Sequence, residues 1–285
     1  MKKTTKTTKE SLRREIREAV RRVRKENPMA PSITNTVTIN LVANAQLAVG
    51  GSAAMVYLAD EGEAMAALGG AMYINMGTIL PVYAETLPRT AKALSEQEKS
   101  WVLDPVGIGV GGLRTSLLQG FRADKPTIIR GNASEIIALA TLWELDDGNT
   151  ASGVRGVDAT DSVESARAAA VALARHTGGA VAVSGPTDLV TDGKSVAWAE
   201  GGSRFLPMIT GAGCSLGGVA AVYACVARPF VAALTATVIY NYAGAEAEKS
   251  AQGPASFQTA FLDALYQATP EAVGAQPFTL ETVGK

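Results

Sequence analysis

The chain has 285 residues, of which 47% are hydrophobic and 19% charged, so it is long and apolar enough to bury a sizeable core. Its 26 Lys and Arg residues nearly balance its 27 Asp and Glu residues, which argues against a general electrostatic hold on nucleic acid or anionic lipid. No apolar run is long enough for a membrane span, and no signal-type apolar core follows the charged start. We therefore expect a cytoplasmic protein with a small-molecule partner and with neither a nucleic-acid nor a membrane partner.

The first predicted elements are a basic tail and an amphipathic helix. Residues 1–10 are rich in Lys and Thr, a composition that predicts disorder, and residues 11–285 are expected to form a single domain. From Leu12 to Arg24 apolar residues recur at helical spacing, and Arg and Glu fill the remaining positions. The interspersed glutamates favour a solvated polar face over a face that binds phosphates or membranes.

Beyond this helix, short apolar runs alternate with Ala-rich stretches of helical length. This alternation predicts an α/β fold with a mainly parallel central sheet and helices on both faces. A helix over Ser165–Arg175 is expected to be capped by Asp161, and an Asp-Gly pair within Asp188–Trp198 predicts a β-hairpin. Residues 143–153 are expected to form a polar surface loop, and the final third is expected to be nearly all helix. The predicted buried strands are Ala54–Leu58, Ala71–Asn75, Trp101–Leu103, Thr127–Ile129 and Ala180–Val183.

Polar side chains follow three of these strands. Asp104 follows one strand, Arg130, Asn132 and Glu135 follow the next, and Ser184 follows a third. Ligands of open α/β sheets bind at the carboxyl ends of the strands, so these residue types suit nucleotide-dependent phosphoryl transfer. Asp104 and Glu135 are candidates to hold Mg²⁺, although either could instead cap a helix or form a buried ion pair. Arg130 is a candidate for the nucleotide phosphates, or for a salt bridge to Glu135.

A glycine-rich turn at residues 209–218, ITGAGCSLGG, leads into an apolar run that predicts a helix. The backbone N–H groups of Gly211, Ala212 and Gly213 are candidates to bind a phosphate at the helix start, and Cys214 lies where that anion would be. The alternative is that the glycines only allow close packing. The turn lacks the Lys that closes a P-loop, and no dinucleotide-binding fingerprint stands out.

The two cysteines and the single histidine indicate little about function beyond the role of Cys214. Cys214 and Cys225 are 11 positions apart on the same predicted helix, which excludes a disulfide between them and fits a reducing compartment. We expect Cys225 to be a small core residue and His176 to be a structural residue at a helix end.

Together these motifs resemble the hydroxyethylthiazole kinases, a family with the ribokinase-like fold. The resemblance extends from about Pro31 to Tyr266, and the Cys that closes the glycine turn and the RGN-x-x-E pattern at Arg130–Glu135 are its most specific parts. The motifs that carry it are ITN at 33–35, DPVG at 104–107, RGNASEI at 130–136, TDG at 191–193, TGAGC at 210–214 and GPASFQTAFLDALY at 253–266.

The resemblance implies ATP- and Mg²⁺-dependent phosphorylation of the hydroxyl of 4-methyl-5-(2-hydroxyethyl)thiazole, in thiamine salvage. Cys214 would stand where ribokinase-like sugar kinases have an Asp base, with Gly211, Ala212 and Gly213 forming the anion hole. The remaining implied roles are thiazole binding by Met55, Gly211 and Asn35, nucleotide binding by Arg130, Ser184 and Asn132, and metal binding by Asp104 and Glu135. A homotrimer with active sites between subunits is also implied.

Four positions depart from the family pattern. Ala212 replaces a Thr of the usual TGTGC, Ser184 replaces the Thr of VTG, and the residues before Met55 lack the usual Ala-Ser-Pro run. Pro31 and Ser32 stand where a His is frequent. The alternatives are a hydroxymethylpyrimidine kinase, a nicotinamide-nucleotide hydrate dehydratase, or a catalytically silent nucleotide-binding protein of the same fold.

Overall fold

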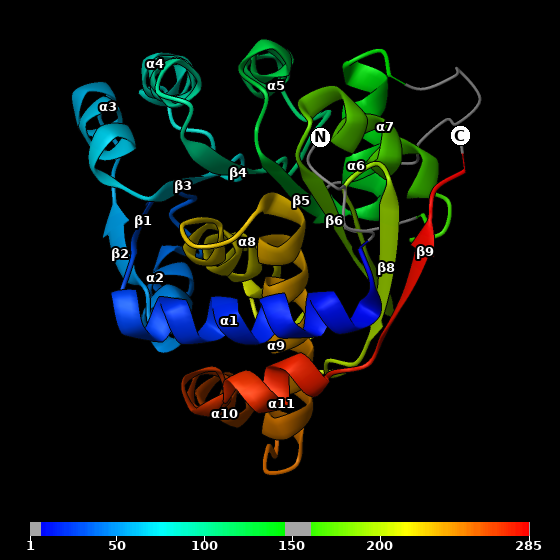
Figure 1. Cartoon of the computed structure of the whole chain (residues 1–285). Coiled ribbons are helices and arrows are strands. Elements are labelled where there is room, and N and C mark those ends of the chain that lie inside the picture. Colours follow the sequence, from blue (N-terminus) through cyan, green and yellow to red (C-terminus); the bar gives the residue numbers. More distant parts are fainter. Residues whose placement is uncertain (1–6, 146–160, 285) are drawn as a thin grey trace.

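In the part of the chain that the structure describes, nine strands form one sheet in the order β2-β1-β3-β4-β5-β6-β7-β8-β9 (Figure 1). The computed structural model describes residues 7–145 and 161–284. Neighbouring strands from β2 to β6 are parallel, and the pairs from β6 to β9 are antiparallel. The strands are β1 (Met29–Ile33), β2 (Ser52–Met55), β3 (Ala71–Asn75), β4 (Ser100–Asp104), β5 (Ile128–Asn132), β6 (Ala180–Ser184), β7 (Thr187–Thr191), β8 (Ser195–Glu200) and β9 (Phe278–Thr282).

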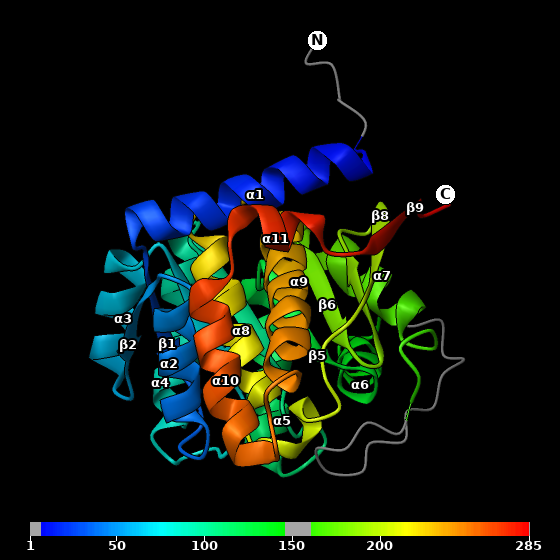
Figure 2. The same cartoon turned by 90° about the horizontal axis from the view of Figure 1, so that it is seen from below.

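Helices cover both faces of this sheet, so the fold has three layers (Figures 1 and 2). Side chains alternate along each strand: Ile128 packs with the layer that contains α8 and α9, whereas Ile129 packs with the opposite layer. The first layer contains α1 (Lys9–Glu26), α2 (Ile39–Ala48), α8 (Ala212–Ala224), α9 (Pro229–Glu248), α10 (Pro254–Gln267) and α11 (Pro270–Ala275). The second contains α3 (Ala59–Leu68), α4 (Tyr83–Glu96), α5 (Gly112–Asp124), α6 (Ala133–Leu142) and α7 (Arg167–Thr177).

This architecture confirms the predicted α/β fold with a mainly parallel sheet. The predicted strand Ala71–Asn75 is β3 to the residue, and the predicted hairpin is formed by β7 and β8, with Asp192 and Gly193 in its turn. The strand expected at Ala54–Leu58 is instead Ser52–Met55, so it ends three residues earlier.

Two strands escaped prediction, β1 and β9. Pro31 lies inside β1, where it lacks a backbone N–H for the sheet ladder. The proline is tolerated because β1 pairs with β3 only from Ser32 onward. The strand pairs with β2 along more of its length, from Met29 to Ser32. β9 is a short edge strand that follows the C-terminal helices and extends the antiparallel part of the sheet.

Helix α1 buries the apolar stripe that its sequence predicts. Leu12, Ile16, Ala19, Val20 and Val23 are all at most 2% exposed. The helix begins at Lys9, so the last two positions of the predicted tail are helical, whereas residues 1–6 lie outside the described residues.

The sequence predicted a solvated polar face for α1, but two of its arginines bind other helices. Arg24 donates to the carbonyl oxygens of Tyr266 and Ala268, at 2.6 and 2.7 Å, and Arg13 donates to that of Gly274 at 3.4 Å. These carbonyls lie at the ends of α10 and α11, where a helix dipole favours a positive charge. The basic face of α1 therefore holds the C-terminal helices in place.

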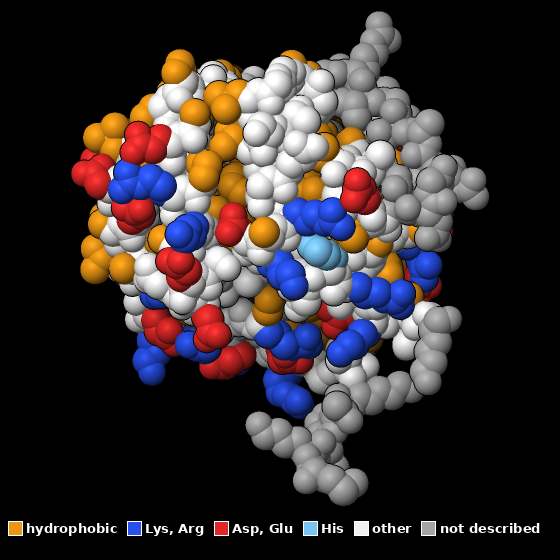
Figure 3. All heavy atoms as spheres, turned by 90° about the horizontal axis from the view of Figure 1, so that it is seen from above, with side chains coloured by type: hydrophobic (Ala, Val, Ile, Leu, Met, Phe, Trp, Pro, Cys, Tyr) orange, Lys and Arg blue, Asp and Glu red, His pale blue; other side chains and the backbone are white. Residues whose placement is uncertain are grey.

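The outer face of the second layer carries both signs of charge, interspersed among apolar side chains (Figure 3). Arg89 on α4, for example, forms ion pairs with Glu63 of α3 and with Glu85 one turn away, both at 2.6 Å. In the described parts of the chain, no helix combines the length and apolar composition that a membrane span needs.

One local prediction was wrong, the cap at Asp161. Helix α7 begins at Arg167 without a side-chain cap, and Asp161 instead accepts a hydrogen bond from the Ser134 hydroxyl at 2.8 Å. The loop expected at 143–153 lies outside the described residues from position 146 onward. His176 contacts the carbonyl oxygen of Arg122 at 3.1 Å and the Trp143 ring, which agrees with a structural role.

Candidate active site

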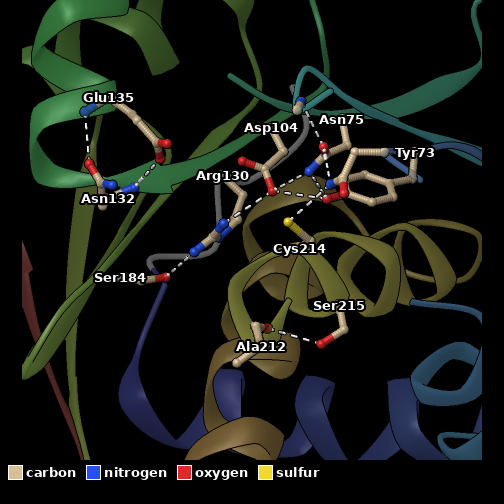
Figure 4. A network of polar contacts seen from close by, with 12 residues as sticks. Tyr73, Asn75, Asp104, Arg130, Asn132, Glu135, Ser184, Ala212, Cys214 and Ser215 are labelled. Carbon is tan, nitrogen blue, oxygen red and sulfur yellow. Dashed lines mark hydrogen bonds and ion pairs between the residues drawn. The ribbon is translucent and has the colours of Figure 1, made fainter. Parts of the chain in front are cut away.

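The candidate site lies where the parallel strands β3, β4, β5 and β6 end side by side. Asn75 pairs in register with Asp104, and Asn132 pairs with Ser184. Arg130 lies on β5, between the ends of β4 and β6, and its guanidinium bridges Asp104 and Ser184 (Figure 4). The expected meeting of polar side chains at this edge of the sheet is therefore present.

Asp104 is the centre of a buried hydrogen-bond network. Its Oδ2 accepts from the Tyr73 hydroxyl at 2.9 Å, from Asn75 Nδ2 at 3.1 Å and from Arg130 Nη1 at 3.1 Å. Its Oδ1 is buried and has no hydrogen-bond partner among the residues that the structure describes. Burial raises the pKa of Asp104 although Arg130 and these hydrogen bonds oppose the rise. The carboxylate therefore keeps one oxygen fixed and the other available.

Arg130 is held on two sides and covered on a third. Its Nη2 donates to the Ser184 hydroxyl at 3.2 Å, and the side chain is 9% exposed. A Cβ atom at Gly213 would lie 2.6 Å from Nη2, which means that the start of α8 approaches the guanidinium as closely as a glycine allows. The pairing of Arg130 with Asp104, rather than with Glu135, answers the question that the sequence left open.

Helix α8 begins at the glycine turn and directs its first N–H groups toward this site. Gly211 is its N-cap, with φ of +92°. The first hydrogen bond of the helix runs from the Ser215 N–H to the Gly211 carbonyl oxygen, at 2.8 Å. The sequence predicted anion donors at Gly211, Ala212 and Gly213, but the Ala212 N–H donates to the Ile209 carbonyl oxygen at 3.4 Å. The N–H groups of Gly213 and Cys214 lie within the first turn, where helices leave donors for an anion, and the anion site itself stays a prediction.

The packing explanation for the glycines holds for the later ones. A Cβ atom at Gly217 would lie 2.4 Å from the Tyr73 ring, and one at Gly218 would lie 2.8 Å from Val42. These two glycines let α8 lie close against β3 and α2, whereas Gly213 gives room to a charged group.

Cys214 is connected to Asp104 through two amides. Asn35 Nδ2 lies 3.5 Å from the Cys214 sulfur and donates to Asn75 Oδ1 at 2.9 Å, and Asn75 in turn donates to Asp104. Asn35 is fixed because its Oδ1 accepts from the N–H groups of Val37 and Thr38. Burial and the Asp104 charge raise the pKa of the Cys214 thiol, so the thiol is protonated at neutral pH.

Glu135 caps α6 and does not join the Asp104 network by a direct hydrogen bond. Its carboxylate accepts from the Asn132 N–H at 2.9 Å, and its own N–H donates to Asn132 Oδ1 at 2.9 Å, which is a capping box. Burial and the neighbouring Asp104 raise the pKa of Glu135 to about 7. The helix-cap alternative for Glu135 is therefore correct, and its metal role stays a prediction. Within residues 7–145 and 161–284, no group of three or more His, Cys, Asp or Glu residues is arranged to hold a metal ion.

The raised pKa of Glu135 predicts a stability effect. Between the ordinary value of 4.5 and about 7, the folded protein retains a proton at Glu135 that the unfolded chain has released, so this group makes the free energy of unfolding fall as the pH rises. We expect Glu135→Gln to remove this contribution, which urea unfolding at pH 5 and pH 7 measures. An unchanged loss of stability between these two pH values in the variant would contradict the assignment.

A cavity of about 770 Å³ opens beside the strand ends. Three predicted nucleotide-binding residues, Arg130, Asn132 and Ser184, line it together with Ala212 and Gly213. Met55, Asn35, Gly211 and Cys214 do not line it. The predicted nucleotide residues are thus brought together, whereas the predicted thiazole residues lie outside this cavity.

Met55 lies at the carboxyl end of β2, the edge strand of the sheet, and is half-buried against the first-layer core. Val37 and Leu58, which follow β1 and β2, are 68% and 50% exposed. The surface around Met55 is therefore open and apolar in a single chain.

The sequence reasoning missed Tyr73 and Asn75, and it missed Asp188 and Asn241 in the cavity wall. A signal existed for Asn75, because it is the last residue of a strand that was predicted correctly, and Tyr73 lies two residues earlier in the same strand. Asn241 had no such signal, since it is one polar residue in the apolar run of α9.

The three-layer α/β architecture is the ribokinase-like fold. A ribokinase-like superfamily protein from Enterococcus faecalis shares the fold, with a TM-score of 0.59 at 11% identity, covering 93% of this chain and 96% of that one. The chain belongs to the hydroxyethylthiazole kinase family, whose sequence profile matches residues 20–271.

Two relatives show how much of the chain this family relationship covers. A hydroxyethylthiazole kinase of Bifidobacterium longum is 51% identical over 280 residues, covering 92% of this chain and 89% of that protein. The structure of the hydroxyethylthiazole kinase protein of Pyrococcus horikoshii is similar with a TM-score of 0.82 at 31% identity, covering 94% of this chain and 99% of that one. The similarity therefore includes both the sheet and the helices around the candidate site.

Proposed function

We propose that this protein transfers the γ-phosphoryl group of ATP to the hydroxyl of 4-methyl-5-(2-hydroxyethyl)thiazole, a step of thiamine biosynthesis and salvage. The observation that carries the proposal is the meeting of Arg130 and the first turn of α8 in the wall of the cavity, with the buried Asp104 paired to Arg130 behind them. Membership of the kinase family supports the reaction class and the substrate.

The cavity beside Arg130 is the proposed site of ATP. Arg130 offers a fixed positive charge to the phosphates, while the hydroxyl of Ser184 and the amide of Asn132 line the same wall. The N–H groups of Gly213 and Cys214, in the first turn of α8, would stabilise the charge that develops on the transferred group. These groups are already ordered by protein contacts, so little reorganisation is needed when the nucleotide binds.

Cys214 is proposed to position the attacking hydroxyl. A protonated thiol is a poor base, and phosphoryl transfer through a loose transition state removes the hydroxyl proton late. The hydroxyl oxygen attacks phosphorus, the bond to the β-phosphate oxygen breaks and ADP leaves. The alcohol proton is lost late in the step to an oxygen of the transferred phosphoryl group, because the protonated Cys214 thiol cannot accept it. Asn35, which holds the sulfur, and Met55 and Gly211 are the proposed thiazole-binding residues.

Mg²⁺ is the proposed metal, held by Asp104 and Glu135 with the nucleotide phosphates. The donor set fits, because Asp104 Oδ1 is a buried acceptor without a partner and carboxylate oxygens are preferred by Mg²⁺. When bound, the ion would neutralise phosphate charge during transfer. The protein's own part is to hold Asp104 Oδ2 in three hydrogen bonds, which orients Oδ1.

The positioning role of Cys214 leads to a prediction for two variants. Cys214→Ala is expected to keep kcat within about a hundredfold of the wild type, since general-base catalysis contributes typically ~10²–10⁴-fold. Cys214→Asp is expected to match or exceed the wild type, because a carboxylate is the stronger base at neutral pH. Steady-state ADP release measures both, and loss of all turnover in both variants with ATP binding intact would contradict a positioning role.

We also propose a homotrimer in which a neighbouring subunit completes the thiazole site at Met55. The exposed Val37 and Leu58 support this, since they lie at the ends of the strands that carry the proposed thiazole residues. The two free thiols, Cys214 and Cys225, agree with a reducing cytoplasmic setting.

The trimer is testable by charge reversal of the apolar surface around Met55. Val37→Glu and Leu58→Glu are expected to lower the mass in light scattering from three times the 29.4 kDa chain mass, and to reduce thiazole turnover with ATP binding retained. Leu113→Glu, at an exposed position of α5, is the matched control. A wild type that is monomeric at the assay concentration would contradict the trimer.

The activity itself is tested by ADP release from Mg·ATP with hydroxyethylthiazole, with hydroxymethylpyrimidine and with no acceptor. Thiazole-dependent release with a phosphorylated thiazole product supports the proposal. Release with the pyrimidine alone would agree with a kinase of this fold but contradict the proposed substrate. No release with either acceptor would favour a silent nucleotide-binding protein.

A further inference from the structure

The cavity wall contains a carboxylate that the proposed phosphoryl transfer does not use. Asp188 lies on β7, directly after the tight turn that follows β6, and it is half-buried with its open side on the cavity. Its Oδ1 accepts from the Gly185 N–H at 3.0 Å, and its Oδ2 accepts from Asn241 Nδ2 at 3.0 Å. Burial raises the pKa of Asp188 to about 6, so the group is still mainly ionised at neutral pH.

Each oxygen of this carboxylate keeps the capacity for another hydrogen bond. A carboxylate offers about four lone-pair sites, and the described protein groups fill only one on each oxygen. The unfilled capacity faces a cavity in which a ligand is expected. A negative group at this point repels phosphates and suits a pair of neutral donors.

The position of Asp188 along the cavity indicates which part of a nucleotide reaches it. Gly185 follows Ser184, whose hydroxyl accepts from Arg130, so Asp188 is one backbone turn away from the guanidinium proposed to bind phosphate. Arg130 is also near enough to lower the pKa of Asp188 by its charge. In a nucleoside triphosphate the group next to the phosphates is the ribose, which carries two neighbouring hydroxyl donors.

Asn241 fixes Asp188 in this place. Its backbone oxygen accepts from the Gly202 N–H at 3.2 Å, so Asn241 joins the β7 wall to the turn after β8. A Cβ atom at Gly201 would lie 2.9 Å from the Asn241 Cβ atom, and Gly201 and Gly202 both have positive φ, so this turn depends on glycine to lie against Asn241. The other charged groups of the cavity, Arg204 and Glu248, are paired with each other at 3.1 Å.

We propose that Asp188, oriented by Asn241, binds the ribose hydroxyls of the nucleotide and makes this site selective for ribonucleotides over deoxyribonucleotides. The inference rests on the proposed function in one respect, that ATP occupies the 770 Å³ cavity beside Arg130. It adds a specificity-determining residue that takes no part in the phosphoryl transfer.

Equilibrium binding of three nucleotides to the full chain tests this proposal. The dissociation constants of ATP, 2′-deoxy-ATP and 3′-deoxy-ATP are measured by calorimetry with Mg²⁺ present. The wild type is expected to bind at least one deoxynucleotide about tenfold more weakly than ATP, the effect of losing one hydrogen bond to a charged group. Asp188→Ala is expected to reduce this discrimination to within about threefold, mainly by weakening ATP.

Two further variants separate recognition from folding. The double variant Asp188→Asn/Asn241→Asp keeps one donor and one acceptor in the pair while it moves the charge, so it is expected to melt near the wild type and still to discriminate less. Glu200→Gln removes a carboxylate from the exposed end of β8, outside the cavity lining, and is expected to discriminate like the wild type.

The outcomes distinguish this proposal from the proposed function. Equal binding of all three nucleotides by the wild type, or unchanged discrimination in folded Asp188→Ala, overturns the ribose contact and leaves the kinase proposal standing. A wild type that binds none of the three overturns both.

Discussion

Asp104→Asn is expected to lower kcat for thiazole phosphorylation by about a thousandfold, the upper end of what one fixed electrostatic group contributes to a transition state. The neutral side chain keeps an acceptor oxygen for Tyr73 and Asn75. It cannot neutralise Arg130, and it presents no charged Oδ1 to a metal and its phosphates. The loss should therefore appear in the rate of the chemical step rather than in the fold.

A comparison of two replacements separates these effects. Asp104→Ala leaves the buried Arg130 without its partner and is expected to lose about 3–5 kcal/mol of unfolding free energy in urea. Asp104→Asn is expected to lose less, because burial already disfavours the charged carboxylate and the amide preserves two hydrogen bonds. Asp263→Asn, on the exposed face of α10, is the control. A kcat within tenfold of the wild type for Asp104→Asn would contradict the central role of Asp104.

Gly213→Ala is expected to raise the KM for ATP by about 10- to 100-fold, the effect of losing one charge-assisted hydrogen bond. The new methyl group would lie 2.6 Å from Arg130 Nη2, and the guanidinium cannot move aside without giving up its bonds to Asp104 and Ser184, at 3.1 and 3.2 Å. Helix propensity alone predicts the opposite, since alanine favours a helix over glycine by about 1 kcal/mol.

Gly120→Ala is the matched control, because Gly120 is also helical and nothing lies within 4 Å of the position of its added Cβ atom. It should be neutral or slightly stabilising in thermal unfolding, with kinetics unchanged. If Gly213→Ala left the KM for ATP unchanged, the close approach of α8 to Arg130 would not matter for nucleotide binding.

The sequence predicted the fold class well because burial dictates its pattern. The apolar stripe of α1 repeats at the helical period, the strand Ala71–Asn75 is a continuous run buried at every position, and both appear as expected. The errors have local causes. Pro31 hid β1 because a proline is tolerated only where one side of the strand is unpaired, and pairing is a property of the whole sheet.

The candidate site was predictable where chemistry and strand ends coincide, as at Asp104, Arg130 and Ser184. The partner of Arg130 was not predictable, since the sequence is equally compatible with a salt bridge to Glu135 and with the observed one to Asp104. Asp188 and Asn241 are 53 positions apart and meet only because α9 packs against β7, so no spacing in the sequence could have joined them.

The contacts of α1 have a consequence for how the chain acquires its fold during synthesis. Helix α1 packs mainly against α9 and α11, and Arg24 is held by the end of α10, so α1 completes its packing only after these C-terminal helices have been synthesised. The strands from β1 to β8 can pair before that, but the first-layer core stays uncovered on this side until about residue 275 has emerged. Until then the chain exposes apolar surface, which makes a partly synthesised chain prone to aggregation.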